Sequence, residues 1–273
     1  MTLCTTMGVS TSGYYAWLVK PKAIPNPRHD EIVIRTKALF KESYSSFGSR
    51  RLSKHLKSEG YLVGRHKARS LMKALDLSVR RKRPYVVTTD SKHNNKVAEN
   101  LLGRRFNPSS PNQVWTTDIT YLKSQSGWVY LAVVIDLYSR QVIGWHVDKV
   151  MSVELCTQAL ITAYWRRKPP KGLLHHSDRG SQYTSVAYQD LLKRFGMICS
   201  MSRKANCWDN APTERFFRSL KHERINWLKM KSLDDVKLEA IDYITWYNSK
   251  RLHSTLGYKT PIGCEKMSLE KIA

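Results

Sequence analysis

The amino-acid sequence predicts an α/β protein in which a mixed five-stranded sheet is flanked by helices and preceded by a small, basic, all-helical region. Three observations support this fold class. From Gln113 onward, short runs rich in Val, Ile, Trp, Tyr and Thr are typical of strands. Strand-like and helix-like segments then follow in the order βββαβαβα, which places a mixed sheet between helices. Before Gln113, apolar residues recur at helical spacing, between many basic residues.

Residues 1–20 have the pattern of a partial helix-turn-helix segment, LCTTMGVSTSGYYAWL. Gly8 can adopt a positive φ in the turn, and Ser10 can cap the helix that follows. An ordinary helical hairpin fits the same pattern. Three prolines within KPKAIPNPRHD then mark a linker.

Residues 28–83 are expected to form a basic helical DNA-binding domain of three short helices. Its apolar positions at helical spacing are Ile32, Ile34, Leu39, Phe40, Leu52, Leu56, Leu62, Leu71, Met72 and Leu75. Basic residues lie between them, and we expect DNA contacts from Arg50, Arg51, Lys54, Arg65, Lys67 and Arg69. Simple solvated helix faces would show the same pattern. The run RRKRP then leads into a polar linker, residues 84–110.

Residues 111–273 are expected to hold the sheet and a C-terminal helical extension. The predicted strands lie in QVWTTDITYL, WVYLAVVIDLYS, RQVIGWHV, GLLHHSD and MICSMS. Helices are predicted in VELCTQALITAYWRR and SVAYQDLLKRFG, and again from Ala211 and from Leu233. The later stretch NSKRLHSTLGYKTP has the composition of a loop.

The net charge of +24 makes nucleic acid the expected partner. Residues 1–110 hold 22 Lys and Arg against 7 Asp and Glu, so this part carries a net +15. A non-specific solubility charge is the alternative. The five cysteines include no CxxC pair, which argues against a disulfide framework or a zinc site. With no apolar run long enough for a membrane span and no signal-peptide pattern, we expect a soluble intracellular protein.

Three carboxylates stand in contexts that favour a metal site. Asp118 lies in the first predicted strand, Asp178 follows a short strand, and Glu214 falls in the first turn of a helix, with intervals of 59 and 35 residues between them. Phosphodiester chemistry needs a strong oxygen nucleophile and charge neutralisation, which two Mg²⁺ ions ~3.5–4 Å apart supply. Mg²⁺ prefers oxygen ligands. Asp118 as a bridge, with Asp178 and Glu214 each completing one ion, meets this requirement.

Other interpretations of the acids stay open at this point. Asp178 also fits ordinary turn chemistry. Asp136 and Asp209 are rival metal ligands. Asp136 could instead pair with Arg140, and Asp209 has the context of a helix N-cap.

Three sequence boxes resemble the signatures of insertion-sequence transposases with a retroviral-integrase-type catalytic core. The boxes are WTTDITYL, HSDRGSQYTS and NCWDNAPTERFFRSLKHE, with the 35-residue interval before Glu214. YSSFGSRRL and YNSKRLHSTLGYKTP resemble the same class, so the similarity covers nearly the whole chain. The match is to the class made from two overlapping reading frames, and the chain is similar to its downstream, orfB-type product.

This resemblance implies an RNase H-like core, a DDE site that binds two Mg²⁺ or Mn²⁺ ions at Asp118, Asp178 and Glu214, and DNA cleavage followed by strand transfer. The implied partners are insertion-sequence ends, target DNA, an upstream-frame helix-turn-helix product joined by frameshifting, and further copies of the chain in a synaptic homo-oligomer. A bacterial cytoplasmic, nucleoid-associated location follows. Unlike retroviral integrases, the chain has no His/Cys spacing of a zinc-binding N-terminal domain.

Two basic residues after Glu214 are candidate DNA contacts. Lys221 lies two helical turns beyond Glu214, so both project from one face, and its ammonium could bind a DNA phosphate. The family pattern also has Lys or Arg there. Arg218 shares the face and could bind DNA or pair with Glu214.

Further candidates flank the boxes. Arg179 follows Asp178 and is a candidate DNA contact. Trp208 could stack on a flipped or frayed base, or pack in a core. His175 and His176 could orient metal or DNA, or simply be packed. The sequence assigns no role to one C-terminal motif, which contains Tyr247, Arg251 and His253.

Two other functions share part of this pattern. A non-catalytic DNA-binding regulator would explain the charge but not the acids. An RNase H-type nuclease would share the metal chemistry but not the long basic N-terminal region.

Overall fold

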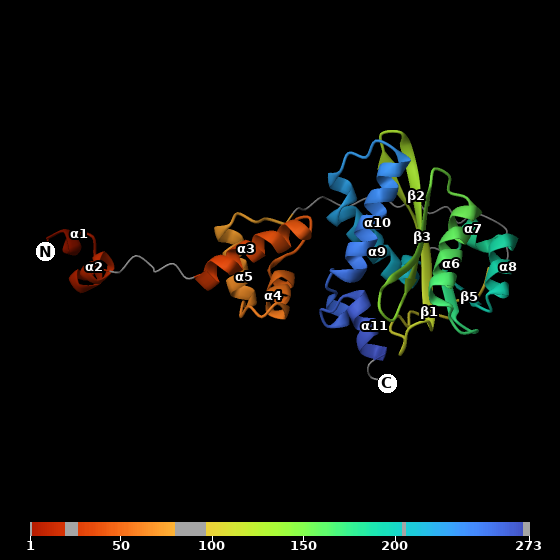
Figure 1. Cartoon of the computed structure of the whole chain (residues 1–273), viewed down its shortest axis with the longest axis horizontal. Helices are drawn as coiled ribbons and strands as arrows, with labels where there is room; N and C mark the ends of the chain where they lie inside the picture. The colour runs from red at the N-terminus through yellow and green to blue at the C-terminus, as the bar shows by residue number, and fades with distance from the viewer. Residues whose placement is uncertain (1, 20–26, 80–96, 204–205, 270–273) are drawn as a thin grey trace. The chain divides into compact units, whose positions relative to one another are not determined.

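The computed structural model describes residues 2–19, 27–79, 97–203 and 206–269, and it divides into two compact units (Figure 1). The first unit contains residues 1–42 and 47–78, and the second contains residues 43–46 and 79–273. Among the described residues, no helix is long and apolar enough to cross a membrane.

The N-terminal segment forms two short helices, α1 (Thr2–Thr6) and α2 (Thr11–Leu18). Gly8 has a φ of 64° in the turn between them. The Ser10 hydroxyl accepts a hydrogen bond from the Gly13 N–H at 3.0 Å, which caps α2 as the sequence predicts. None of the α2 residues is buried.

The basic region forms the three predicted helices, α3 (Pro27–Glu42), α4 (Ser49–Ser58) and α5 (Arg65–Ala74). Their small core consists of apolar residues at helical spacing, Ile32, Leu39, Phe40, Leu52, Leu56, Ala68 and Leu71. Two of the apolar positions at helical spacing, Ile34 and Leu62, are exposed and lie outside this core. Ile34 lies two residues from Ile32, about 200° around the helix. Leu62 lies in the loop before α5.

The second unit contains a mixed sheet with the strand order β3-β2-β1-β4-β5. The strands are β1 (Val114–Ser124), β2 (Gly127–Asp136), β3 (Val142–Asp148), β4 (Leu174–Ser177) and β5 (Ile198–Met201). The first three form an antiparallel meander, whereas β4 and β5 are parallel to β1. All five strands were predicted.

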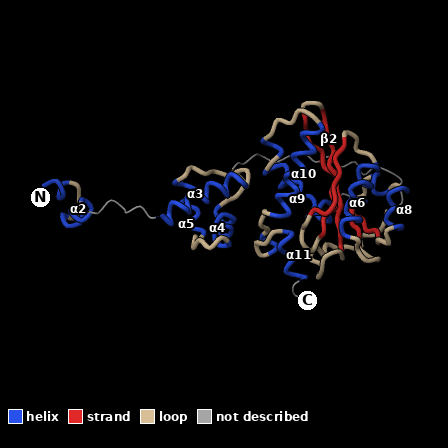
Figure 2. The backbone as a smooth tube through the Cα atoms, viewed as in Figure 1, coloured by secondary structure: helices blue, strands red, loops and turns tan. Residues whose placement is uncertain are grey.

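Helices cover both faces of this sheet (Figures 1 and 2). One face packs on α6 (Val153–Arg167), α7 (Ser181–Thr184) and α8 (Val186–Arg194). The other packs on α9 (Ala211–Glu223) and α10 (Leu233–Ser249). Alternate β2 residues serve the two cores, with Val133 facing α9 and α10 while Ala132 faces α6.

Short 3₁₀ turns occupy the connections η1 (Cys207–Asn210), η2 (Ile225–Trp227) and η3 (Ser254–Leu256). The chain continues past its loop-like motif into a helix that was not predicted, α11 (Pro261–Leu269). Its first residue is proline, which suits the first helical position because the missing N–H is not needed there.

The expected linker, residues 84–110, differs from a simple tether. Residues 80–96 lie outside the described part. From Val97 onward the chain packs on the sheet unit, where Leu102 is fully buried. The Ser200 hydroxyl of β5 accepts the N–H groups of Leu101 and Leu102 at 3.0 and 3.2 Å. Apolar Leu102 thus anchors a segment whose overall composition is polar.

Candidate active site

Strand register places Asp118 and Asp178 side by side. The parallel ladder pairs Thr116 of β1 with His176 of β4. Asp118 follows two residues later in β1, and Asp178 directly follows the end of β4, whose neighbouring parallel strand β1 lies about 4.8 Å away. β1 pairs with β4 only as far as Thr116, so both acids lie just beyond the end of this pairing.

Both aspartates are half-buried and are held by nearby backbone N–H groups. Asp118 Oδ1 accepts the Ile119 N–H at 2.8 Å, and Asp178 Oδ1 accepts the Gly180 N–H at 2.9 Å. A Cβ added at Gly180 would lie only 3.1 Å from Asp178 Oδ1. The glycine therefore leaves room for this carboxylate to turn back onto the loop.

Two hydrogen bonds dock the first turn of α9 against β1. Thr213 Oγ1 donates to Thr116 Oγ1 at 2.8 Å, and Asn210 Nδ2 donates to the Thr117 carbonyl at 3.2 Å. All four residues are buried. Glu214 directly follows Thr213, so this polar contact sets its position relative to Asp118. The sequence alone did not reveal these positioning residues.

The three acids interact electrostatically. Burial raises the pKa of Asp118 well above its usual range, and the charges of Asp178 and then Glu214 raise it further, while the Ile119 N–H and Lys221 oppose the shift. Burial and the Asp178 charge likewise raise the pKa of Glu214. Carboxylates that repel one another in a partly desolvated place are stabilised by a cation between them.

This donor set suits Mg²⁺ or Mn²⁺, because hard divalent ions prefer carboxylate oxygens and need few protein ligands. Within the described residues, no three His, Cys, Asp or Glu side chains are already arranged as a metal cage. The fit therefore rests on the chemistry and mutual repulsion of Asp118, Asp178 and Glu214.

Lys221 lies on α9, close enough to Asp118 for their charges to interact. Its charge lowers the pKa of Asp118, and Asp118 in turn opposes the lowering of the Lys221 pKa by burial. The ammonium lies 4.3 Å from the ring centroid of Tyr121, a cation–π contact that the sequence did not indicate. Arg218 is exposed and forms no ion pair with Glu214, so that alternative is wrong.

Asp136 has a structural role. It is buried, its pKa is raised by burial, and it accepts hydrogen bonds from the N–H groups of Asn112 at 2.7 Å and Tyr138 at 2.9 Å. The expected partner Arg140 instead donates to Asn107 Oδ1 at 2.7 Å. Asp136 thus fixes the turn after β2 and does not join the three acids.

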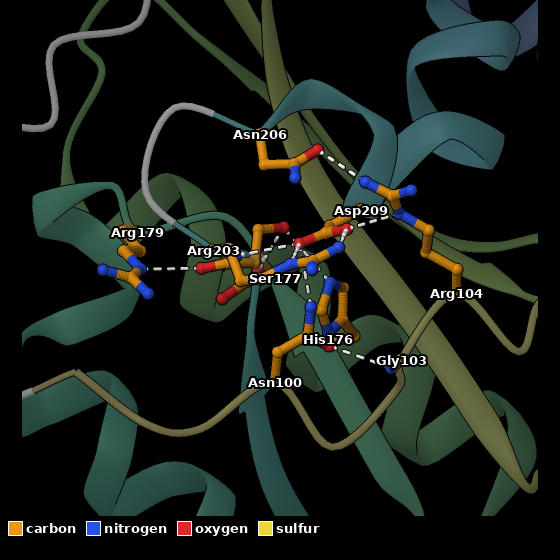
Figure 3. A network of polar contacts seen from close by, with 10 residues as sticks. Asn100, Gly103, Arg104, His176, Ser177, Arg179, Arg203, Asn206 and Asp209 are labelled. Carbon is orange, nitrogen blue, oxygen red and sulfur yellow. Dashed lines mark hydrogen bonds and ion pairs between the residues drawn. The ribbon is translucent and has the colours of Figure 1, made fainter.

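Asp209 is the centre of a polar network and not a helix N-cap (Figure 3). Its carboxylate is fully buried and accepts the Arg203 guanidinium at 2.9 Å and the Arg104 Nε at 2.9 Å. Asn100 Nδ2 donates to it at 2.8 Å. Hydrogen bonds from Arg203, and also from Arg104, lower the pKa of Asp209. The network connects residues 100–104 to the loop after β5. In the sequence, this loop comes immediately before η1 and α9.

Both histidines are packed inside the protein. His175 Nε2 lies 2.9 Å from the Tyr188 hydroxyl, and His176 Nδ1 lies 2.9 Å from the Ser200 hydroxyl. Burial lowers the pKa of His175 to about 3 and that of His176 to about 4. They are therefore neutral near pH 7, and the packed alternative is correct. Arg179 donates from Nε to the Ser202 carbonyl at 2.6 Å.

The remaining candidate DNA contacts lie at the surface. Trp208 is 69% exposed, so the core-packing alternative is wrong. In the first unit, the exposed basic side chains include Arg50, Lys54, Arg65, Lys67 and Arg69. Arg51 is half-buried, with its guanidinium 5.7 Å from the Phe47 ring.

The C-terminal motif without an assigned role forms a buried ion pair. The Arg251 guanidinium makes two hydrogen bonds to Glu223, at 2.8 and 2.7 Å, and a third to the Ser219 hydroxyl at 3.2 Å. Tyr243 of α10 donates to Glu223 at 2.8 Å. Glu223 ends α9, so the motif fixes the far end of the helix that carries Glu214 and Lys221.

Comparisons with known proteins identify the family of the chain. Models of the integrase core domain match residues 108–207 and 196–261, and a model of an HTH-like domain matches residues 27–85. The insertion element IS600 uncharacterized 31 kDa protein of Shigella sonnei is 39% identical over 260 residues, covering 95% of this chain and 96% of that protein. Transposase InsF for insertion sequence IS3A of Escherichia coli (strain K12) is 38% identical over 273 residues, covering 98% and 94%.

A cryoEM structure of a simian T-cell lymphotropic virus intasome, in complex with PP2A regulatory subunit B56 gamma, shares the fold. The likeness has a TM-score of 0.51 at 17% identity and covers 80% of this chain and 70% of that chain. The sheet unit has the RNase H-like integrase core fold that the sequence predicted. By its family matches and by its identity to InsF along nearly the whole length, the chain belongs to the insertion-sequence transposases with an integrase core domain, a family of polynucleotidyl transferases.

Proposed function

We propose that the chain cleaves DNA at the ends of an insertion sequence and transfers the cut strand to target DNA, with Asp118, Asp178 and Glu214 as ligands of two Mg²⁺ or Mn²⁺ ions. One observation carries this proposal. The three acids and Lys221 come from three separate parts of the sheet unit, and their charges act on one another's pKa values. Asp118 would hold the ions together with each of the other two acids, because the charges of both act on its pKa.

When bound, the two ions would supply a stronger oxygen nucleophile and charge neutralisation on the leaving oxygen. The chain supplies the rest. Its acids fix the ligand oxygens, and the docking of α9 on β1 holds Glu214 in register with Asp118. The Lys221 ammonium binds the phosphate of the reacting strand and keeps it beside Asp118.

We assign DNA binding outside the metal site to basic side chains and to Trp208. Arg50, Arg51, Lys54, Arg65, Lys67 and Arg69 of the HTH-like domain bind DNA phosphates, and Arg179, Trp208 and Arg218 contact DNA on the core. An upstream-frame helix-turn-helix product, joined by frameshifting, contributes recognition of the element ends. Several copies of the chain act together in the synaptic complex, in the bacterial cytoplasm at the nucleoid.

The experiment uses a labelled duplex that carries an element end, a target duplex, and Mg²⁺ or Mn²⁺. The purified chain, also fused to its upstream product, should yield nicked and then joined DNA, and Asp118→Asn should abolish both products. Asp190→Asn, an exposed acid on α8, is the matched control and should retain both. Full activity of the Asp118→Asn variant would overturn the proposal. Hydrolysis without any joined product would instead favour a nuclease.

A further inference from the structure

Four side chains on one face of the β1–β2 hairpin form a surface of aromatic rings and positive charge, which we call the hairpin surface: Tyr121, Lys123, Trp128 and Tyr130. The register pairs Tyr121 with Tyr130 and Lys123 with Trp128. Directly opposed residues share a face, and Tyr121 and Lys123 are two apart, so all four lie on the same face. Trp128 is 52% exposed, Lys123 is exposed, and the two tyrosines are half-buried.

The aromatic pair at its centre is ordered by its own contacts. The Tyr121 and Trp128 rings meet edge to face, with centroids 5.1 Å apart and planes at 86°. The Lys221 ammonium lies 4.3 Å from the Tyr121 centroid. The indole of Trp128 is thus held in place on one side while half of it stays open to solvent.

Lys221 connects the hairpin surface to the candidate active site. The same ammonium contacts Tyr121 and acts on Asp118, three residues earlier in β1. β4 pairs with β1 only as far as Thr116, so Asp118 and Tyr121 lie beyond the end of this pairing. A DNA strand bound with a phosphate at Lys221 would carry its neighbouring nucleotides over or beside these rings.

We propose that the hairpin surface is a stacking site for an unpaired DNA base next to the reacting phosphate. Bases stack on exposed aromatic rings without sequence preference, and Lys123 and Lys221 match the charge of the adjoining phosphates. Asp148 stands opposite Tyr130 on β3, so the positive part of the surface ends there. This inference rests on the proposed function, because it needs a DNA strand at Lys221.

Trp165 of α6 provides a matched control. It is 63% exposed and also meets a tyrosine edge to face, with its centroid 5.5 Å from that of Tyr164 and an interplanar angle of 81°. Tyr164 stacks on Phe195, and Trp165 lies in the last turn of α6, whereas Trp128 lies at the start of β2. The two tryptophans therefore match in exposure and ring partner but differ in position.

The test measures binding of a labelled single-stranded oligonucleotide by fluorescence anisotropy, in EDTA so that no cleavage occurs. Trp128→Ala should weaken binding by about five- to a hundredfold, the range for loss of one stacked base. Trp128→Phe should keep most of the affinity, and Trp165→Ala should leave it unchanged. Equal affinities for Trp128→Ala and Trp165→Ala, with both folded by circular dichroism, would overturn the inference.

A second readout separates stacking from charge. An oligonucleotide with 2-aminopurine near its 3′ end should lose fluorescence on binding, and Trp128→Ala should restore it while Trp165→Ala should not. Unchanged quenching in the Trp128→Ala protein would also overturn the inference. If Trp128→Ala behaves as wild type while Asp118→Asn loses strand transfer, only the stacking site falls. If Trp128→Ala loses affinity while Asp118→Asn stays active, the proposed metal site falls instead.

Discussion

At the scale of single residues, hydrogen-bond partners distinguish Asp136 and Asp209 from the proposed metal ligand Asp118. Asp136 and Asp209 are saturated with hydrogen bonds from nearby N–H and guanidinium groups. Asp118 accepts one backbone hydrogen bond, and its pKa is raised by burial and then by the two neighbouring carboxylates. The sequence identified Asp118 by its motif, but it offered Asp136 and Asp209 as rivals. Their partners are set by turns and loops, whose geometry the residue pattern does not encode.

His175 gives a prediction about pH. Its pKa is about 3 when folded, below the usual 6.5, so the unfolded chain takes up the proton first as the pH falls. The stability from this neutral histidine is complete above about pH 6.5 and is lost progressively below it, by about 2 kcal/mol at pH 5. Urea unfolding of His175→Gln should therefore show a shallower fall in free energy between pH 6.5 and 5 than wild type. His66→Gln, at an exposed position, should keep the wild-type slope, and a wild-type slope in both would contradict the prediction.

At the scale of elements, the strands were predictable because their side chains follow a local pattern. The parallel register of β1 and β4, which sets Asp118 beside Asp178, could not be predicted from such a pattern. The docking of α9 depends on Thr213 and Thr116, which are 97 residues apart and ordinary in composition. Helix α11 was missed because an ion pair between Glu265 and the distant Arg167 holds it. The packing of residues 97–106 was missed because it depends on the buried Leu102 and on hydrogen bonds to Ser200.

The α9 docking predicts a role for Thr213. Thr213→Val removes the hydroxyl that donates to Thr116 and leaves the buried oxygens of Thr116 and Asn210 without this donor. The loss should cost about 1–3 kcal/mol of stability. Misplacement of Glu214 should also slow strand transfer by about tenfold or more and raise the Mn²⁺ concentration for half-maximal rate. Thr213→Ser keeps the hydroxyl and should restore the Mn²⁺ dependence. A Thr213→Val protein with wild-type Mn²⁺ dependence would rule out this positioning role.

The far end of α9 predicts a larger effect on folding. Arg251→Met leaves the buried Glu223 charge without its guanidinium partner and should lower the free energy of unfolding by about 3–5 kcal/mol. The double variant Glu223→Leu/Arg251→Met should recover much of that loss, because neither charge remains. Arg218→Met, exposed on the same helix, should change stability by less than about 0.5 kcal/mol in urea unfolding. Equal stability of the Arg251→Met and Arg218→Met proteins would count against the buried pair.

At the scale of the whole molecule, the net charge of +24 and its excess in residues 1–110 agree with a DNA-binding family. The sequence sufficed for this conclusion, because charge needs no fold to be counted. It did not show which basic residues are free to bind, since burial of Arg51 and the contact of Lys221 with Tyr121 depend on tertiary packing.

The salt dependence of DNA binding tests the basic helices. Replacing Lys54, Arg65 and Arg69 with Gln should reduce the slope of log K against log salt concentration by about 2.7, if each contacts one phosphate. The control protein carries Lys168→Gln, Lys171→Gln and Lys250→Gln, at three exposed lysines of the sheet unit. It loses the same charge and should keep a nearly unchanged slope. Equal reductions in both triples would mean that net charge alone drives binding.

Binding of Mn²⁺ to the DNA-bound chain tests the central claim most directly, that Asp118, Asp178 and Glu214 form one metal site. Isothermal titration of the chain with an element-end duplex should show saturable binding that Asp118→Asn and Glu214→Gln each weaken at least about tenfold, as expected for loss of a charged ligand. The exposed-acid variant Asp190→Asn should titrate like wild type. Wild-type Mn²⁺ affinity in both the Asp118→Asn and Glu214→Gln proteins would contradict the account.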